Sequence, residues 1–231
     1  MASLWLVRHA QASIDADDYD CLSVHGREQA RLLGINLRAR GFAPALACSG
    51  TLKRQRDTLT LALAELDAPP PSLMDADWDE IDAVALLRAH APQHENIAAL
   101  RRALAEDATP ERAFLRMFAH ALSRWQGGDF EHEYHETWPA FRARVATALR
   151  TLIERLRDTR GDALVLTSGG VIATACAIAA ELPDARVFPI NLGLANVGIT
   201  RLAIEGDALR VITLNDFGWL ETHDPAAVTY R

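Results

Sequence analysis

An arginine and a histidine stand side by side at the end of the first apolar segment, in the sequence Leu6-Val7-Arg8-His9-Ala10. The planar guanidinium of Arg8 presents several N–H donors in a geometry that matches phosphate oxygens. The imidazole of His9 is able to attack phosphorus through one ring nitrogen if the other nitrogen is held as a donor. The pair therefore points to phosphoryl chemistry, while an ordinary charged pair that closes a strand is the simpler alternative.

Another cation, Arg54, lies where a second apolar segment gives way to a helical pattern. Ser49-Gly50-Thr51 lead into this pattern, which runs from Leu52 to about Leu66. Arg54 falls in the first turn, where a positive charge opposes the helix dipole, so its placement favours an anionic partner nearby. The alternative is a solvated arginine on a basic first turn.

Strands and helices that would position these residues are visible in the apolar pattern. Ser3 to Val7 reads as a buried strand, Ser23 to Arg40 as a helix with Ser23 as its N-cap, and Ala45 to Cys48 as a second strand. Each strand is followed by a loop and a helix. Open α/β sheets bind ligands in this place, beyond the carboxyl ends of their strands.

The remaining pattern predicts an α/β fold, a three-layer sandwich with a mostly parallel sheet and helices on both faces. We expect one domain over residues 1–231, with a helical insertion at about 84–136. The other expected elements are a short strand at Ser72–Met74, an amphipathic helix at Thr137–Arg160, a buried strand at Ala163–Leu166, a helix at Val171–Glu181, and hairpin strands at Val197–Ile204 and Leu209–Leu214.

Composition narrows the class of partner. The 231 residues are 49% hydrophobic and carry a formal net charge of -7, which argues against nucleic acid or an acidic membrane surface as a partner. Cys21, Cys48 and Cys176 are odd in number and widely spaced, which fits reduced thiols and not a disulfide or zinc framework. Cys48 and Cys176 are expected in the core. With no apolar run of membrane-spanning length, we expect a cytoplasmic protein.

Several motifs occur in an order that resembles the histidine phosphatase superfamily, also called the phosphoglycerate mutase-like branch, from about Ser3 to Leu220. They are Leu6-Val7-Arg8-His9, Gly26-x-x-Gln29-Ala30, Ser49-x-x-Leu52-Lys53-Arg54 and Leu166-Thr167-Ser168-Gly169-Gly170-Val171. The resemblance implies that His9 is the nucleophile that becomes a phosphohistidine. It also implies that Arg8 and Arg54 clamp the phosphoryl group, that Gly169 belongs to the substrate-binding turn, and that no metal or other cofactor takes part.

The same resemblance implies an acid that protonates the leaving oxygen, normally a glutamate after the third strand. Trp78-Asp79-Glu80-Ile81 is similar to the start of that motif, but Val84 stands where the family has glycine. Glu80 is therefore the candidate acid, with Asp79 and Asp82 as competitors. A carboxyl that acts as an acid near neutral pH needs a raised pKa, which burial beside Trp78 would supply.

Two positions depart from the family pattern near the expected phosphoryl group. Ala10 replaces the usual glycine of Arg-His-Gly, a tolerable change in an ordinary backbone region. Ser168 replaces a second histidine, so a donor is kept but a group able to carry positive charge is lost. Losing one transition-state contact typically costs about 100- to 1000-fold in rate. Alternatively, Ser168 only closes a turn, with its hydroxyl bonded to nearby backbone.

The sequence thus predicts a phosphatase that hydrolyses phosphomonoesters or related phosphoryl groups of a small phosphorylated substrate or a phosphoprotein. A phosphoglycerate mutase-like phosphotransferase and a weakly active or non-catalytic phosphoryl-ligand binding protein are the alternatives. Ser168 favours the binding protein, whereas the presence of both His9 and an acid favours chemistry. Metal binding by His90 with His94, or by His132 with His135, is less favoured than a surface role, because no further ligands are suitably spaced. No role is assigned to His25, His120 and His223.

Overall fold

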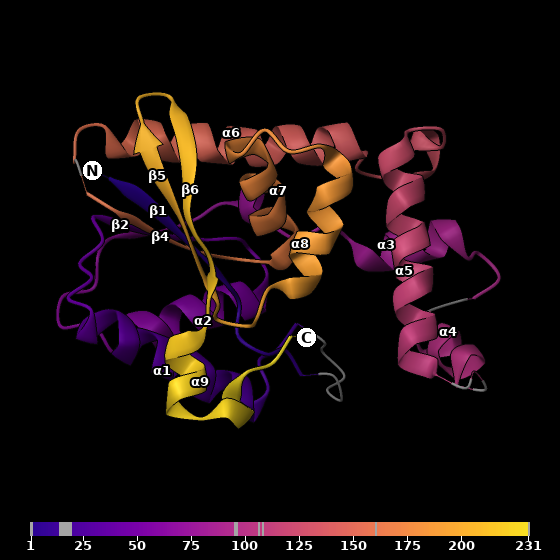
Figure 1. Ribbon diagram of the computed structural model, residues 1–231, viewed down its shortest axis with the longest axis horizontal. Coiled ribbons are helices and arrows are strands. Elements are labelled where there is room, and N and C mark those ends of the chain that lie inside the picture. The colour runs from indigo at the N-terminus through magenta and orange to yellow at the C-terminus, as the bar shows by residue number, and fades with distance from the viewer. Residues whose placement is uncertain are drawn as a thin grey trace. The chain divides into compact units, whose positions relative to one another are not determined.

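A computed structural model describes residues 2–13, 20–94, 97–105, 107, 109–159 and 161–230. Its strands are β1 (Ser3–Arg8), β2 (Leu46–Ser49), β3 (Ser72–Met74), β4 (Ala163–Thr167), β5 (Ile199–Glu205) and β6 (Ala208–Asp216). Its α-helices are α1 (Val24–Ala39), α2 (Lys53–Leu63), α3 (Ala83–His90), α4 (Ile97–Leu104), α5 (Pro110–Gly127), α6 (Trp138–Leu156), α7 (Gly169–Ala179), α8 (Val187–Gly193) and α9 (Gly218–His223). Figure 1 shows their course.

The six strands form one sheet in the order β3-β2-β4-β1-β5-β6. β1, β2, β3 and β4 run parallel, and β5 and β6 are antiparallel additions at one side. In the register, Arg8 lies opposite Thr167, and Ser49 lies opposite both Leu166 and Met74. The residues that follow these four strand ends therefore meet at one edge of the sheet, which confirms the predicted mostly parallel arrangement.

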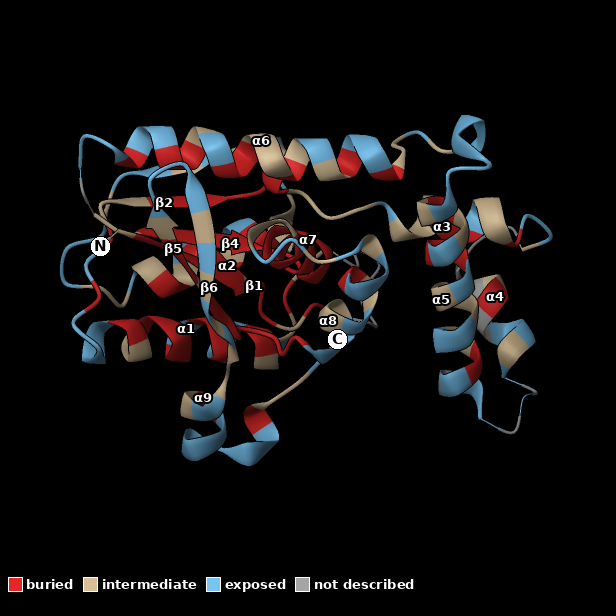
Figure 2. Ribbon diagram, turned by 45° about the horizontal axis from the view of Figure 1, so that its top comes forward, coloured by how far each residue is buried: buried red, intermediate tan, exposed pale blue. Residues whose placement is uncertain are grey.

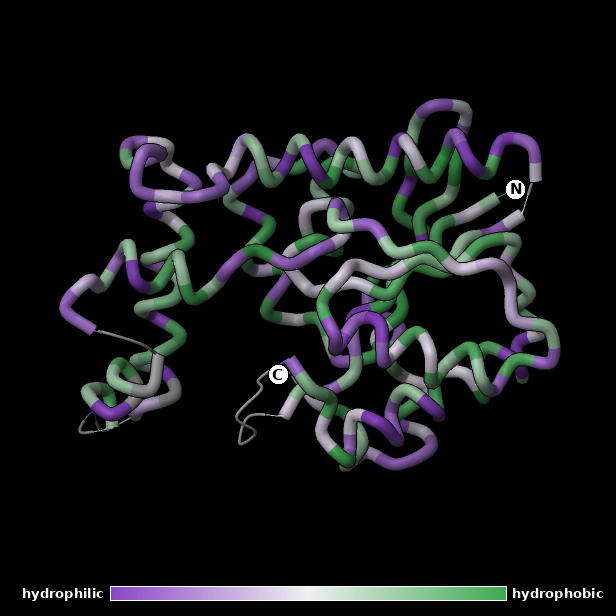
Figure 3. Tube along the Cα trace, turned by 180° about the vertical axis from the view of Figure 1, so that it is seen from behind, coloured by the Kyte–Doolittle hydropathy of each residue, from purple (hydrophilic) through white to green (hydrophobic). Residues whose placement is uncertain are grey.

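Helices cover both faces of the sheet, as predicted for a three-layer α/β fold. Figure 2 shows α1 on one side of the strands and α6 on the other, with β1, β2 and β4 mostly buried. The core on the α1 side includes side chains from β1, β4 and the two helices that follow β1 and β2: Trp5, Val7, Leu164, Leu166, Leu33, Leu37 and Leu59. Figure 3 shows the matching pattern, since hydrophilic and hydrophobic residues alternate along α6 while the strands are mainly hydrophobic.

The chain divides into two compact units, one formed by Met1–Glu80 with Val145–Arg231 and the other by Ile81–Arg144. The first unit contains the sheet. The second contains α3, α4 and α5 around a small core that includes Leu87, Leu100 and Ala121. The prediction of one domain with a helical insertion at about 84–136 is not decided by this division and stays a prediction.

Several element boundaries differ from those expected. α7 begins at Gly169, two residues before the predicted start, and α2 ends at Leu63. The short helices α8 and α9 were not predicted. α8 contains Pro189, and a proline inside a helical pattern normally argues against a helix unless it falls in the first turn, as it does here. Within the described ranges, no helix has the length and hydrophobicity needed to cross a membrane.

Gln29, a member of the second motif, ties three segments together from inside α1. Its side chain is fully buried. Its Oε1 accepts a hydrogen bond from Gln11 N at 2.8 Å, and its Nε2 donates to Ala227 O at 2.7 Å and to Thr229 Oγ1 at 2.9 Å. The loop after His9 and the C-terminal segment are therefore both held against α1 by one amide.

Replacing Gln29 by leucine is expected to lower the free energy of unfolding by about 2 kcal/mol, because the buried partners of the amide lose their hydrogen bonds. Urea unfolding monitored by circular dichroism measures the change. Glu28→Ala, which removes an exposed pair with Arg31, is the control and should change little. Equal midpoints for Gln29→Leu and wild type would show that the amide does not stabilise the fold.

Candidate active site

His9 follows the end of β1 and is fixed by its own backbone. Its N–H donates to Thr167 O at 2.8 Å, and its carbonyl accepts from Asn196 Nδ2 at 2.9 Å. The next residue, Ala10, donates its N–H to Thr58 Oγ1 at 3.1 Å on α2. Ala10 is absent from the described residues with a positive φ, so its replacement of glycine needs no unusual backbone, as expected.

The two ring nitrogens of His9 have different partners. Nδ1 lies 2.8 Å from the carbonyl oxygen of Ala10, which only accepts hydrogen bonds, so Nδ1 carries the proton. Nε2 lies 3.2 Å from Nε of Arg54, which only donates, so Nε2 presents its lone pair. Both contacts select the same tautomer. This is the arrangement that a nucleophilic histidine requires.

His9 is also kept uncharged. Its side chain is buried, and burial together with the positive charges of Arg54 and Arg8 holds the pKa of the imidazole well below its ordinary value. The hydrogen bond to Ala10 acts in the opposite direction but is the smallest of these effects. Near neutral pH the ring is therefore neutral and its Nε2 lone pair is available.

Arg8 and Arg54 are both anchored through Nη1, but by different partners. Arg8 Nη1 donates to Leu194 O at 2.5 Å and to Tyr230 O at 3.3 Å. Arg54 Nη1 forms an ion pair with Asp20 Oδ1 at 2.6 Å. The anionic partner that the sequence predicted for Arg54 is thus present inside the chain. Its placement alone does not require a phosphate, and the observation that links Arg54 to the site is its contact with His9.

The side chain of Glu80, in the segment after β3, contacts the start of α7. Its Oε2 accepts a hydrogen bond from Gly170 N at 2.9 Å, and a Cβ on Gly170 would overlap with Glu80 Oε1. The two competing carboxylates are engaged elsewhere, since Asp79 accepts from the N–H and hydroxyl of Thr51, and Asp82 caps α3 through Ala85 N at 2.9 Å. Of the three candidate acids, Glu80 is the one whose carboxylate is bound at the end of β4.

Ser168 is fully buried at the N-cap of α7, but its side chain makes no capping hydrogen bond. Its Oγ accepts instead from Gln55 Nε2 at 2.9 Å, and the same Nε2 donates to Trp78 O at 3.2 Å. The alternative expectation, a hydroxyl bonded to nearby backbone, is therefore wrong. Gln55 links Ser168 to the segment that carries Glu80.

The glycine after Ser168 is needed because other side chains approach it closely. A Cβ on Gly169 would overlap with Asn191 Oδ1 and lie 3.7 Å from Arg8 Nε. Asn191 comes from α8, which the sequence did not predict. Gly169 thus lets α7 begin directly against Asn191 and Arg8.

Sequence reasoning located the paired motifs but missed residues that reach the site from other segments. Asp20, Gln55, Asn191 and Asn196 contact or adjoin the predicted site residues. One signal was available for Asp20. Leu52, at the N-cap of α2, has no side-chain acceptor, so the first N–H groups of the helix are left to water or to an acceptor from another segment.

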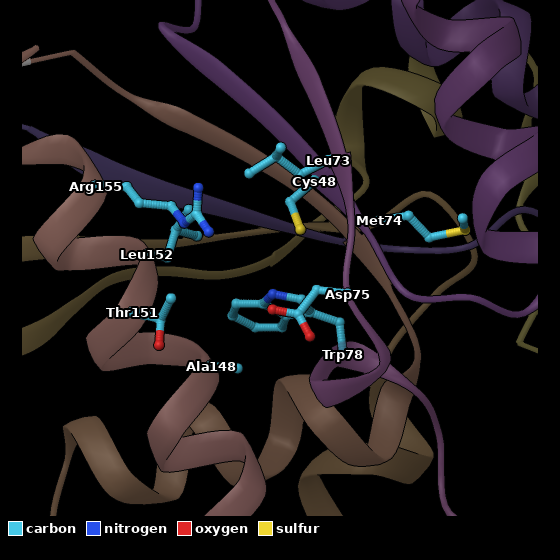
Figure 4. Close-up of a pocket in the computed structure, with 9 residues that line it drawn as sticks. All are labelled: Cys48, Leu73, Met74, Asp75, Trp78, Ala148, Thr151, Leu152 and Arg155. Atoms are coloured by element: carbon cyan, nitrogen blue, oxygen red, sulfur yellow. The ribbon is translucent and has the colours of Figure 1, made fainter.

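A cavity of about 280 Å³ lies away from the predicted site residues, between α6 and the β2–β3 side of the sheet (Figure 4). Burial raises the pKa of the Cys48 thiol in its wall to about 12, so this thiol is not a nucleophile near neutral pH. Cys176 is likewise a buried thiol with a pKa raised to about 12 by burial, and both cysteines lie in the core as expected. The cavity is lined by Cys48, Leu73, Met74, Asp75, Trp78, Ala148, Thr151, Leu152 and Arg155.

Metal ligation by the remaining histidines finds no support in the geometry. Across the described stretches of the chain, no group of three or more His, Cys, Asp or Glu side chains is placed to hold a metal ion. His90 stands edge-on to His120 with ring centroids 6.4 Å apart, and His132 is highly exposed beside Glu133.

Known structures share this fold. A phosphoglycerate mutase from Bacillus anthracis is 17% identical, with a TM-score of 0.65 over 95% of this chain and 95% of that chain. An alpha-ribazole phosphatase from Shigella flexneri is 20% identical, with a TM-score of 0.60 over 93% and 96%. A mycobacterial glucosyl-3-phosphoglycerate phosphatase is 22% identical, with a TM-score of 0.61 over 93% and 99%.

A sequence model of the histidine phosphatase superfamily (branch 1) matches residues 4–113 and 104–217. These ranges include every motif on which the resemblance rested, from Arg8 and His9 to the turn at Ser168. The chain belongs to the histidine phosphatase superfamily.

Proposed function

We propose that the chain is a phosphatase that hydrolyses phosphomonoesters through a phosphohistidine at Nε2 of His9. One observation supports this most directly: a buried, neutral imidazole presents Nε2 to the guanidinium of Arg54 at 3.2 Å. A phosphoryl group bound between Nε2 of His9 and the guanidinium of Arg54 would contact a nucleophile and a cation at the same time. Both are needed for transfer, because the charge on the equatorial oxygens must be stabilised as the new bond forms.

The reaction has two steps in this proposal. Nε2 of His9 forms a bond to phosphorus while the ester P–O bond breaks, and the electron pair of that bond stays on the leaving oxygen. Glu80 gives this oxygen a proton, so the alcohol leaves neutral. A water molecule then attacks phosphorus, Glu80 takes the proton from the water, and the P–N electron pair returns to Nε2.

Arg8 and Arg54 supply positive charge that a metal ion supplies in other phosphoryl-transfer enzymes, so we propose metal-independent hydrolysis. The substrate is a small phosphorylated molecule or a phosphorylated protein side chain. Because the chain as a whole is negative, attraction to an anion is local to the site. Two of the three cysteines are buried as free thiols, which fits a reducing compartment such as the cytoplasm.

Ser168 supports a second candidate function, a phosphoryl-ligand binding protein with little or no turnover. The serine is neutral and its hydroxyl is engaged with Gln55, so it contributes no positive charge to a transferred group. If the chain is a phosphatase, serine in place of the family's second histidine predicts a turnover lower by about 100- to 1000-fold, the usual effect of one missing transition-state contact. Binding alone would require neither the fixed tautomer of His9 nor Glu80, and we therefore favour catalysis.

The phosphohistidine proposal predicts that brief exposure to a radiolabelled phosphodonor leaves an acid-labile, alkali-stable label on the protein. The label should be absent in His9→Ala, and hydrolysis of an aryl phosphate without added metal should fall to background in that variant. Labelling of wild type and variant to the same extent would exclude His9. Phosphate binding by wild type without labelling or turnover would favour the binding protein.

Removing the charge of Arg54 should raise the pKa of His9 toward its ordinary value, because that charge disfavours the imidazolium form. In Arg54→Ala, the ring should therefore take up its proton at higher pH than in wild type. NMR titration of the His9 imidazole measures this without any substrate. Arg56→Ala is the control, because Arg56 is an exposed arginine two positions further along α2. An unshifted titration in Arg54→Ala would show that the two groups are not coupled.

Glu80→Gln should impair hydrolysis of alkyl phosphates much more than that of activated aryl phosphates, because only poor leaving groups need a proton. Gly170→Ala should show the same selectivity, since its Cβ would displace the Glu80 carboxylate. Gly193→Ala, whose Cβ would meet open space, is the matched control. If both site variants affected all leaving groups equally, Glu80 would not be the acid.

A further inference from the structure

The N-terminus of α2 is capped by a residue from far away in the sequence. Leu52 occupies the N-cap position and contributes no side-chain hydrogen bond. The carboxylate of Asp20 takes this place, because Oδ2 accepts from Lys53 N at 2.7 Å and Oδ1 lies 3.4 Å from Arg54 N. A carboxylate here is stabilised both by the free N–H groups and by the helix dipole.

The same carboxylate also binds the side chain of Arg54. Asp20 Oδ1 lies 2.6 Å from Arg54 Nη1, while Arg54 Nε points to His9 Nε2 at 3.2 Å. In a guanidinium group, Nε and Nη2 share one edge, and Nη1 lies away from that edge. Asp20 therefore binds the guanidinium on its Nη1 side, which leaves the Nε edge facing the nucleophile.

Asp20 is itself held in place by its neighbours. An isolated bridge joins Ala12 to Leu22, and Ser13 N donates to Cys21 O at 2.7 Å. On the other side, Lys53 Nζ lies 2.9 Å from Cys21 Sγ. The segment that carries Asp20 is thus attached both to the loop after β1 and to the first residue of α2.

We propose that Asp20 is the positioning residue for Arg54, fixing its backbone and guanidinium together so that the Nε edge faces the phosphoryl group on His9. Arg8 offers a comparison, since neutral carbonyls hold its Nη1, whereas a full negative charge holds that of Arg54. Asp20 thereby also offsets part of the positive charge that an anionic substrate meets. This role rests on the proposed phosphatase function of His9 and Arg54.

A double-mutant cycle tests the proposal with wild type, Asp20→Ala, Arg54→Ala and the double variant. The readouts are kcat and KM for an aryl phosphate, and the affinity for vanadate and inorganic phosphate by calorimetry. With Arg54 present, Asp20→Ala should lower kcat about 10- to 100-fold, the loss expected when a transition-state contact is misplaced. In the Arg54→Ala background, removing Asp20 should cause no further loss, and oxyanion affinity should stay the same or rise because an unpaired carboxylate is gone.

Asp20→Asn should restore part of the loss, since an amide oxygen keeps an acceptor for Nη1 or for the helix N–H groups but lacks the charge. Asp224→Ala is the control for loss of a capping aspartate, because Asp224 accepts from Ala226 N in a short C-terminal turn. It should leave turnover unchanged. Unfolding free energies of all variants separate a loss of fold from a loss of function.

If Asp20→Ala caused equal losses in the two backgrounds, Asp20 would be only a helix cap and the proposal would be overturned. It would also be overturned if Asp20→Ala kept the turnover and the vanadate affinity of wild type. If Asp20→Ala does not fold, Asp20→Asn takes its place in the cycle with the same expectation of a loss only when Arg54 is present. If wild type shows no turnover that depends on His9, the proposed function fails. Vanadate binding still decides the role of Asp20 in that case, because it requires no catalysis: Asp20→Ala should weaken it only when Arg54 is present.

Discussion

The site depends on an imidazole buried without charge beside two guanidinium groups. Burial and two cations each disfavour protonation of His9, and they act together. In the proposed function, the same two cations attract the anion that the neutral ring attacks. A more exposed histidine would lose the desolvation that helps to keep it unprotonated. One arrangement therefore keeps the nucleophile neutral and concentrates positive charge where phosphoryl oxygens would lie.

The parallel sheet makes that arrangement possible. Because β4 lies between β1 and β2, the carboxyl ends of all three strands meet, and the residues after them are His9, Gly50 and Ser168. α1 connects β1 to β2, which runs in the same direction. α2 follows β2 and therefore begins at this same edge, where it brings Arg54 to His9. The hydrogen bonds that anchor the His9 backbone come from β4 and from Asn196, just before β5. The position of the nucleophile thus follows from strand order and register.

Much of this was predictable from the sequence, for a physical reason. Arg8 and His9 sit directly after an apolar run, and Arg54 sits in the first turn of a clear helical pattern, so local periodicity was enough to place them at strand and helix ends. Periodicity carries no information on contacts between distant residues. Asp20 reaches Arg54 across 34 positions, and Gln55 reaches Ser168 across 113.

For the acidic residues near Trp78, the structure adds the partner of each carboxylate to what the sequence predicted. The motif around Trp78 favoured Glu80, but Asp79 and Asp82 stayed competitors because all three are carboxylates within four positions. What separates them in the structure is the partner of each, and the carboxylate of Glu80 is bound by the N–H of a glycine 90 residues away. Only a residue without a Cβ at position 170 leaves space for that carboxylate. Gly170 is therefore needed because Glu80, in the segment after β3, occupies the space that a Cβ would take.

Ser168 is held in a network of neutral groups. The side-chain amide of Gln55, on α2, binds both Ser168 at the start of α7 and the carbonyl of Trp78. The turn after β4 is therefore fixed without a second imidazole. All of these groups are neutral. In the proposed phosphatase, the positive charge offered to a phosphoryl group rests on Arg8 and Arg54, and Asp20 offsets part of the charge of Arg54. An anion is held less tightly by such a site than by one with a further cation, which weakens transition-state stabilisation but also favours release of the phosphate product.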